Sequence, residues 1–284
     1  MNPYETYIQK LAELTVEAHS YPLGGFHDYP VVPRQKGAPV ALIFSPHPDD
    51  EVIIGGWALR LLRQSGWRVV NVAVTQGSSQ KRQQERWREL ANCCRCIGFD
   101  LQAASATGLE GVNAKTRSGD PERWGSMVQV IAGILSDYTP RAIFYPHQAD
   151  WNSTHIGTHH VVVDALTSLP ASFSCAAIET EFWGQNPAPN VLVESSPEDL
   201  AALVTALTWH VGEVQRNPYH LTLPAWMMDN VRRGGEWVGG QGNAAPDFLF
   251  GTLYRLRKWT GGRFEDAALP KGFVSAADDP AALL

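Results

Sequence analysis

The chain has 284 residues, of which 44% are hydrophobic and 18% are charged, and its formal net charge is -6 at pH 7. This length and composition favour one α/β domain with a substantial core over two small domains. The acidic balance argues against a nucleic-acid partner, and the lack of both a run of ~20 apolar residues and a signal peptide predicts a soluble, cytoplasmic protein without a membrane span.

The first 38 residues predict a helix followed by a loop. Apolar side chains recur at helical spacing over residues 4–18, which predicts a helix that packs on the main domain. This stripe consists of Tyr4, Tyr7, Ile8, Leu11 and Leu14. Residues 19–38 are rich in proline and glycine and predict a loop, so we expect the catalytic part of the chain to begin after it.

The most informative stretch is Ser-Pro-His-Pro-Asp-Asp-Glu at residues 45–51. It follows a strand-like apolar run over residues 40–44 and precedes a helix-like run over residues 52–62. The motif is therefore expected at the carboxyl end of a strand, where open α/β folds bind their ligands. Burying this much charge is costly unless a cation or hydrogen bonds compensate it, which favours a divalent metal.

The residue types of this motif suit a metal site. An imidazole and a carboxylate are ligands for Zn2+ or Fe2+, so His47 and either Asp49 or Asp50 can supply two ligands. The remaining aspartate can stay free as the general base. The alternative is that the aspartate pair only caps the start of a helix.

An alternation of strands and helices predicts the fold class. A strand over residues 68–75 and a helix over residues 81–97 follow the motif. This order is typical of a Rossmann-like, doubly wound, mostly parallel sheet with flanking helices. The four cysteines do not form the pattern of a secreted disulfide framework, and we expect them to pack in the core.

A second polar loop repeats the layout of the first. A strand over residues 142–146 leads into a loop over residues 147–155, which contains Asp150-x-Asn152-x-x-His155, and a helix follows. A catalytic zinc site usually has three protein ligands and a water. The histidine of this loop is the candidate for the third ligand.

Together, Pro-His-Pro-Asp-Asp-Glu at residues 46–51 and Asp150-x-Asn152-x-x-His155 resemble the two motifs of the PIG-L/LmbE family of metal-dependent de-N-acetylases. The first motif matches completely, and the second matches at Asp150 and His155. The resemblance extends over roughly residues 38–215. It implies a hydrolase, a deacetylase of the N-acetylglucosamine type, with a Rossmann-like fold.

The resemblance also implies roles for individual residues. The implied metal ligands are His47, Asp50 and His155. Asp49 corresponds to the base, and Arg86 stands where the family is suggested to contact substrate hydroxyls or phosphate. Zinc is the favoured metal, although two histidines and one carboxylate also suit Fe2+. By resemblance to chitobiose-type deacetylases, a homo-oligomer such as a trimer or hexamer is expected.

The second motif departs from the family at two positions. Asn152 stands where the family usually has a histidine that stabilises the oxyanion or protonates the leaving amine, and Thr154 replaces an aspartate. An asparagine amide can donate a hydrogen bond to an oxyanion, but it cannot deliver a proton at neutral pH. His147 is our first candidate to replace the missing histidine. Asp150 is expected to orient a ligand histidine, and His159 to lie behind the ligands or as a neutral core group.

The rest of the chain completes the predicted sheet and adds a cap. A strand over residues 175–182 and a helix over residues 197–211 close the core, and residues 248–257 predict a last strand. We divide the single domain into an N-terminal helix and loop (1–38), a catalytic core (39–215), a C-terminal cap at the substrate (216–270) and a tail (271–284). The tail is expected to be weakly ordered or bound to a neighbouring subunit.

The predicted cap contains candidate substrate contacts. Aromatic rings beside polar side chains suit sugar binding, because a ring stacks on the sugar while polar groups bond to its hydroxyls. His220 and Trp226 are the candidates. The alternative is an ordinary C-terminal cap whose tryptophans fill the core.

Together with the metal motif, the resemblance implies a zinc-dependent hydrolase that removes an acetyl or other small acyl group from an N-acylated amino sugar. The expected substrates are N-acetylglucosamine, a chitobiose-like disaccharide or a conjugate of N-acetylglucosamine. One alternative is an amidase that acts on a thiol conjugate or a natural-product glycoside. Another is a sugar-binding protein with impaired catalysis, which Asn152 and Thr154 would favour.

Overall fold

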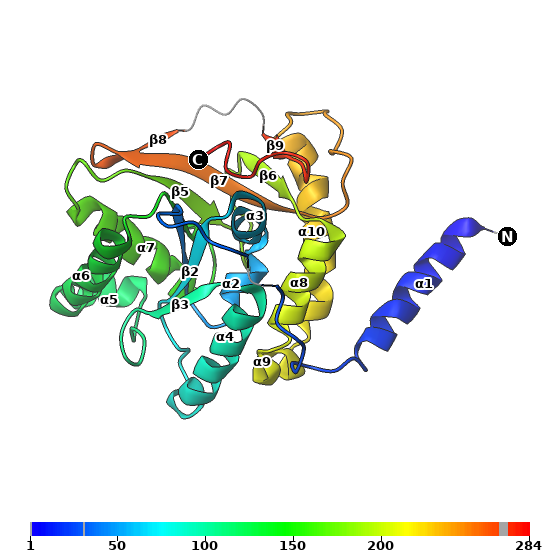
Figure 1. Cartoon of the computed structure of the whole chain (residues 1–284), viewed down its shortest axis with the longest axis horizontal. Coiled ribbons are helices and arrows are strands. Elements are labelled where there is room, and N and C mark those ends of the chain that lie inside the picture. The colour runs from blue at the N-terminus through cyan, green and yellow to red at the C-terminus, as the bar shows by residue number, and fades with distance from the viewer. Residues whose placement is uncertain (1, 31, 267–271) are drawn as a thin grey trace.

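The structure is a computed structural model that describes residues 2–30, 32–266 and 272–284. In this part of the chain, nine strands form one sheet in the order β3-β2-β1-β4-β5-β7-β6-β9, with β8 paired to β7 (Figure 1). The strands are β1 (Val40–Ser45), β2 (Arg68–Ala73), β3 (Asp100–Ala103), β4 (Ala142–Pro146), β5 (Cys175–Thr180), β6 (Val191–Glu194), β7 (Gly251–Thr260), β8 (Arg263–Asp266) and β9 (Phe273–Val274). The predicted α/β class with a mostly parallel sheet is confirmed.

Strand β1 lies at the centre of the parallel half of the sheet. It pairs in parallel with β2 on one side and with β4 on the other, and the β4 register matches Ala41 with Ala142 and Ile43 with Phe144. Because parallel strands present their carboxyl ends at the same sheet edge, the two polar loops that follow β1 and β4 lie side by side. The topology thus brings the two motifs together.

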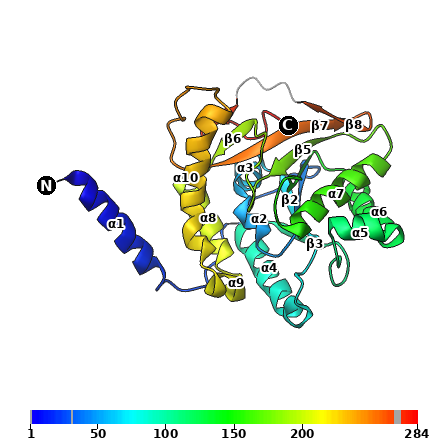
Figure 2. The ribbon, with the colours of Figure 1, turned by 180° about the vertical axis from the view of Figure 1, so that it is seen from behind.

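Helices cover both faces of the sheet (Figures 1 and 2). One core cluster packs α3, α4, α8 and α10 on the sheet, and the other packs α6 and α7 on the opposite face. Buried aliphatic and aromatic side chains at helical spacing explain these contacts. The helices are α1 (Pro3–Ala18), α2 (Asp50–Ile53), α3 (Gly56–Ser65), α4 (Gln83–Ile97), α5 (Ala114–Gly119), α6 (Pro121–Tyr138), α7 (Ser153–Ser168), α8 (Pro197–Leu207), α9 (Val211–Arg216) and α10 (Tyr219–Trp237), with a 3-10 turn at Gln80–Arg82.

The C-terminal half of the sheet is antiparallel around β7. This strand lies between β5 and β6 and is antiparallel to both. The predicted last strand is therefore part of the sheet interior rather than of a separate cap. The sequence analysis did not predict β3, β6, β8 or β9, each of which has at most four residues. Such short strands give too few alternating positions for a pattern to stand out.

The tail packs on its own chain, which corrects the expectation that it is weakly ordered or held by another subunit. Strand β9 pairs with β6, and the indole nitrogen of Trp57 donates to the Pro280 carbonyl at 2.8 Å. The guanidinium of Arg60 donates to the Ser275 carbonyl, also at 2.8 Å. Both Trp57 and Arg60 are fully buried, so the tail satisfies two core side chains. The predicted boundary at residues 270 and 271 lies outside the described residues.

The N-terminal helix α1 also differs from its prediction. It forms as expected, with the Asn2 side chain accepting a hydrogen bond from the Tyr4 amide as an N-cap. However, it projects away from the domain (Figures 1 and 2), and none of its residues is buried. Tyr4 remains 74% exposed and Leu11 49% exposed, so the apolar stripe faces solvent.

Within the described residues, no helix has both the length and the apolar character needed to cross a membrane.

The two chain ends predict opposite effects of truncation. Removing residues 2–18 should change the free energy of unfolding by less than about 1 kcal/mol, because α1 buries no side chain. Removing residues 276–284 should cost more than about 3 kcal/mol, because Trp57 loses its acceptor and Leu283 and Leu284 no longer pack on the core. Urea unfolding of both variants tests this, and equal losses would contradict it.

Candidate active site

The first motif forms a tight turn between β1 and α2. Asp49 adopts a left-handed backbone conformation with φ 114°, which is strained for a residue with a side chain. Its amide donates to Glu51 Oε2 at 2.9 Å, so the expectation that Glu51 bonds the motif turn is confirmed. Asp50 Oδ2 accepts from the His47 amide at 2.8 Å. These two bonds stabilise the turn from within the motif.

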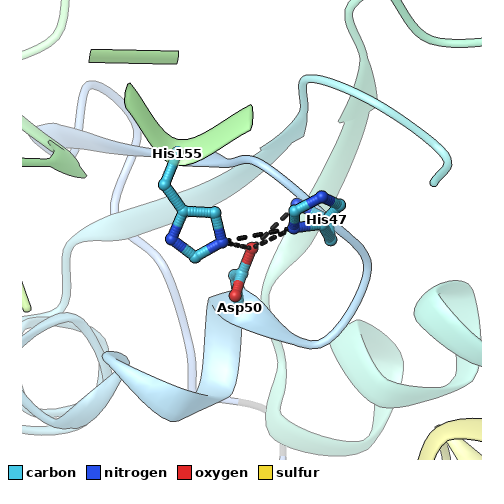
Figure 3. Close-up of side chains that lie close together, drawn as sticks. All are labelled: His47, Asp50 and His155. Carbon is cyan, nitrogen blue, oxygen red and sulfur yellow. Dashed lines mark hydrogen bonds and ion pairs between the residues drawn. The ribbon is translucent and has the colours of Figure 1, made fainter. Parts of the chain in front are cut away.

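Three potential ligand atoms converge at this turn (Figure 3). His47 Nδ1 and His155 Nε2 lie 3.2 Å apart, and each lies 3.4 Å from Asp50 Oδ2. With bonds of about 2.0–2.2 Å, tetrahedral zinc separates neighbouring donor atoms by about 3.3–3.6 Å. The spacing of His47, Asp50 and His155 therefore fits the binding of one zinc ion by these three residues.

The electrostatics of this group favour a positive charge. Asp50 and His155 are buried, whereas the His47 side chain is 22% exposed and opens toward solvent. Burial opposes a charge on His155, but Asp50 and Asp150 outweigh it and raise the pKa of His155 to about 9. Burial also opposes ionisation of Asp50, but the two histidines hold its pKa well below the usual range. A cation placed among these groups would gain the same attraction.

The second motif holds His155 in place. Asp150 Oδ2 lies 3.4 Å from His155 Nδ1, the ring nitrogen that faces away from Asp50, as expected for a residue that orients a ligand. Asn152 is the N-cap of α7, with Oδ1 accepting from the Thr154 amide at 2.9 Å and from the His155 amide at 3.4 Å. This cap fixes the first turn of α7, which carries His155.

Asp49 lies beside the three ligand atoms with different partners. Its Oδ2 accepts from the Tyr219 hydroxyl at 2.6 Å and lies 3.4 Å from the Arg86 guanidinium. These contacts contradict the alternative in which the aspartate pair only caps a helix. Burial and the neighbouring Asp50 raise the pKa of Asp49 to about 6, although Arg86 and Tyr219 act in the opposite direction.

Two other predicted histidines make backbone contacts. His147 accepts from the Ala149 amide at Nδ1 (3.1 Å) and donates from Nε2 to the Gly184 carbonyl (2.8 Å). Both ring nitrogens are engaged, so the structure contradicts the prediction that His147 replaces the missing histidine. His159 Nδ1 lies 2.9 Å from the Pro146 carbonyl, and burial lowers the pKa of His159 to about 4. It is a neutral core group, one of the two roles expected for it.

The three predicted substrate contacts lie in different surroundings. Arg86 donates to the Pro48 carbonyl at 2.8 Å and has a 12% exposed side chain, so it supports the motif turn rather than facing an open cavity. Together with Tyr219, Trp226 lines a cavity beside the group of His47, Asp50 and His155. His220 is buried, and it does not line either of the two cavities described at this site, so its substrate contact stays a prediction.

A polar cavity of about 370 Å³ opens at the exposed side of His47. Its wall contains side-chain amides and hydroxyls, one carboxylate and one guanidinium. Besides His47, the residues that carry these groups are Thr75, Ser78, Gln80, Gln83, Glu110, Asn113, Arg123 and Thr154. Such groups can bond to the hydroxyls of a sugar.

Comparison with known proteins agrees with this geometry. The model of the family described as PIG-L, GlcNAc-PI de-N-acetylase, matches residues 42–166, which include both motifs. Residues 42–166 therefore match the PIG-L family, and both motifs lie within this matched region. No curated protein matches the sequence significantly.

Solved structures share the PIG-L fold at low sequence identity. The N,N'-diacetylchitobiose deacetylase from Pyrococcus horikoshii is 16% identical, with a TM-score of 0.57 over 92% of this chain and 94% of the other. The teicoplanin deacetylase Orf2, in its zinc-inhibited form, is 15% identical, with a TM-score of 0.59 over 81% of this chain and 100% of the other. The 4-carboxy-2-hydroxymuconate hydratase GalB from Pseudomonas putida is 13% identical, with a TM-score of 0.57 over 77% and 95%. A hydratase among them means that the fold alone does not determine the reaction.

Sequence reasoning missed two side chains that contact the motif. Tyr219 was passed over in favour of its neighbour His220, although the seven-residue spacing from Tyr219 to Trp226 places these two on one helix face. The second is His210, whose Nε2 lies 2.8 Å from Glu51 Oε1 in the fully buried core. No local signal links His210 to a motif 159 residues earlier.

The pair of Glu51 and His210 generates a prediction about stability. Replacing His210 with leucine should cost about 3 kcal/mol or more, because a buried carboxyl group loses its partner. His210→Gln, whose amide can still donate, should lose less. Urea unfolding measures both, with His27→Leu as a surface control. A loss for His210→Leu no larger than that of the control would count against the pair.

Proposed function

We propose that this chain is a metal-dependent hydrolase that removes an acetyl or other small acyl group from the amide nitrogen of an amino sugar. The observation that carries the proposal is the triangle of His47, Asp50 and His155, with Asp49 beside it as an unliganded carboxylate. Two structural neighbours are named as deacetylases of N,N'-diacetylchitobiose and of teicoplanin, which supports this class of reaction.

His47, Asp50 and His155 would hold the metal. Their donor types suit Zn2+, and they also suit Fe2+. A divalent metal bound there would polarise the amide carbonyl of the substrate and make the attacking water more acidic. Asp150 would keep the ring of His155 oriented toward the metal.

Asp49 would act as the proton carrier. Its carboxylate would take a proton from the attacking water and return it to the amide nitrogen as the carbon–nitrogen bond breaks. This route needs no histidine at position 152, because one carboxyl group serves both steps. The Tyr219 hydroxyl holds Asp49 Oδ2 at 2.6 Å, which leaves the other carboxylate oxygen for the water.

Asn152 would assist through its amide hydrogens. Its oxygen is engaged as the N-cap of α7, so the nitrogen of the same amide group remains as a donor. A donor in this position would stabilise the negative oxygen that develops as the carbonyl is attacked. The sugar hydroxyls would then lie in the polar cavity beside His47.

The base assignment predicts that proton transfer and metal binding can be separated. Asp49→Asn should lower kcat by about 10²–10⁴-fold while metal content stays at that of the wild type. His155→Ala should instead lose the metal, because it removes one of three ligands. Amine release from N-acetylglucosamine and N,N'-diacetylchitobiose, together with metal analysis of the purified proteins, tests both. Loss of metal from Asp49→Asn would show that Asp49 is a ligand.

The contact of Tyr219 with Asp49 predicts a smaller loss. Tyr219→Phe should lower kcat/KM by about 10–100-fold, because Asp49 loses the hydrogen bond that orients it. Tyr138→Phe is the matched control, since its hydroxyl bonds Gln102 at 3.3 Å, away from the site. If both variants keep full activity, the hydroxyl does not position the base.

A further inference from the structure

A second cavity, of about 250 Å³, lies beside the metal centre and is distinct from the polar one. It shares walls with the site. Tyr219 lines it and bonds Asp49, and Phe182 lines it while its ring packs edge-on against His155 at a centroid distance of 4.6 Å. A group bound here would thus be in contact with the side chains that hold the base and a ligand.

The walls of this second cavity are mostly apolar. The residues that give it this character are Ile53, Phe182, Trp183, Tyr219, Leu223 and Trp226. Trp183 is 47% exposed and packs edge-on against Tyr219. Its ring centroid also lies 6.1 Å from that of Trp151, which is 71% exposed. An exposed tryptophan that lines a cavity and has a second exposed tryptophan as its neighbour is typical of a binding surface.

The charged groups of the cavity neutralise one another. Arg233 forms a close ion pair with Glu181, and its Nε lies 2.8 Å from Asp229 Oδ2. Glu181 is 1% exposed and Arg233 8%, so the pair forms a closed wall. Asp229 also pairs with Arg232 at 2.7 Å, so the two carboxylates have two guanidinium partners and the cavity has no net charge to attract an ionic ligand.

We propose that this aromatic cavity binds a neutral aryl or short alkyl group of the substrate while the substrate's amide lies at the metal centre. The inference rests on the proposed function and specifies its substrate class as an N-acyl amino sugar that carries an apolar substituent. With a volume of about 250 Å³, the cavity is smaller than most ligand pockets and suits one ring or a short chain. The polar cavity on the His47 side receives the sugar.

The apolar group has two chemical sources, and the test has one arm for each. In the acyl arm, N-hexanoylglucosamine is compared with N-acetylglucosamine. In the aglycone arm, phenyl N-acetyl-β-glucosaminide is compared with the methyl glycoside. In at least one arm, kcat/KM for the substrate with the larger apolar group should exceed kcat/KM for its comparison substrate by at least about tenfold. Burial of a few apolar carbons is enough to give a difference of this size.

Substitutions in the cavity wall then test whether the preference for apolar substrates depends on this cavity. Trp226→Ala and Trp183→Ala should bring the ratio of the two kcat/KM values close to one, because each removes a wall of the cavity. The matched control is Trp237→Ala, which lies on the same helix as Trp226, is 57% exposed and should leave the ratio unchanged. A ratio near one in both arms of the wild type would overturn the proposal, and so would an equal loss in the control.

Binding without turnover separates this proposal from the proposed function. Quenching of tryptophan fluorescence by phenyl N-acetyl-β-glucosaminide and by hexyl glucoside is measured on the Asp49→Asn protein and on its Trp226→Ala double variant. One outcome is that the Asp49→Asn protein binds these probes and the double variant does not, while the metal-loaded wild type hydrolyses no N-acyl sugar. That outcome would support the proposed cavity and overturn the proposed deacylase function. Hydrolysis by the wild type without such binding would overturn the cavity alone.

Discussion

Three consecutive carboxyl groups are buried at the carboxyl end of β1, and the rest of the site depends on how each is compensated. Asp49, Asp50 and Glu51 are all 9% exposed or less, which would be costly if they had no partners. Each of the three carboxyl groups is compensated by different partners. Asp49 is held by Tyr219 and Arg86, Asp50 by two histidines and the metal that we propose, and Glu51 by His210 and the Asp49 amide.

This division explains why neighbouring residues can have different roles. The left-handed backbone of Asp49 turns its side chain toward α10, while Asp50 starts α2 and points at His155. The strain at Asp49 is maintained by the Glu51 contact with its amide. The partners come from distant parts of the chain, so the PIG-L domain of residues 42–166 does not complete the site by itself. His210 and Tyr219 both lie beyond it.

The sequence was sufficient to predict the helices and strands that are long or that flank a motif with several polar residues. The first strand, the polar motif after it and the histidine at the start of α7 could all be predicted, because period-2 and period-3.6 patterns identify their flanking elements. Contacts that depend on three-dimensional packing could not. Nothing near His147 indicates that the backbone of Gly184 occupies its ring, and helix phase alone separates Tyr219 from His220. The apolar stripe of α1 likewise predicts a helix, but it does not indicate whether this helix packs against the rest of the domain.

The most direct test of the account is an anomalous difference map from a crystal of the zinc-loaded protein. The account predicts one ion bonded to His47 Nδ1, Asp50 Oδ2 and His155 Nε2 at about 2.0–2.2 Å, with Asp49 unliganded and bonded to Tyr219. A second group with suitable donor spacing consists of Glu51, Cys93 and His210, all fully buried. An ion at that second group, or one with Asp49 as a ligand, would contradict the division of roles among the three carboxyl groups.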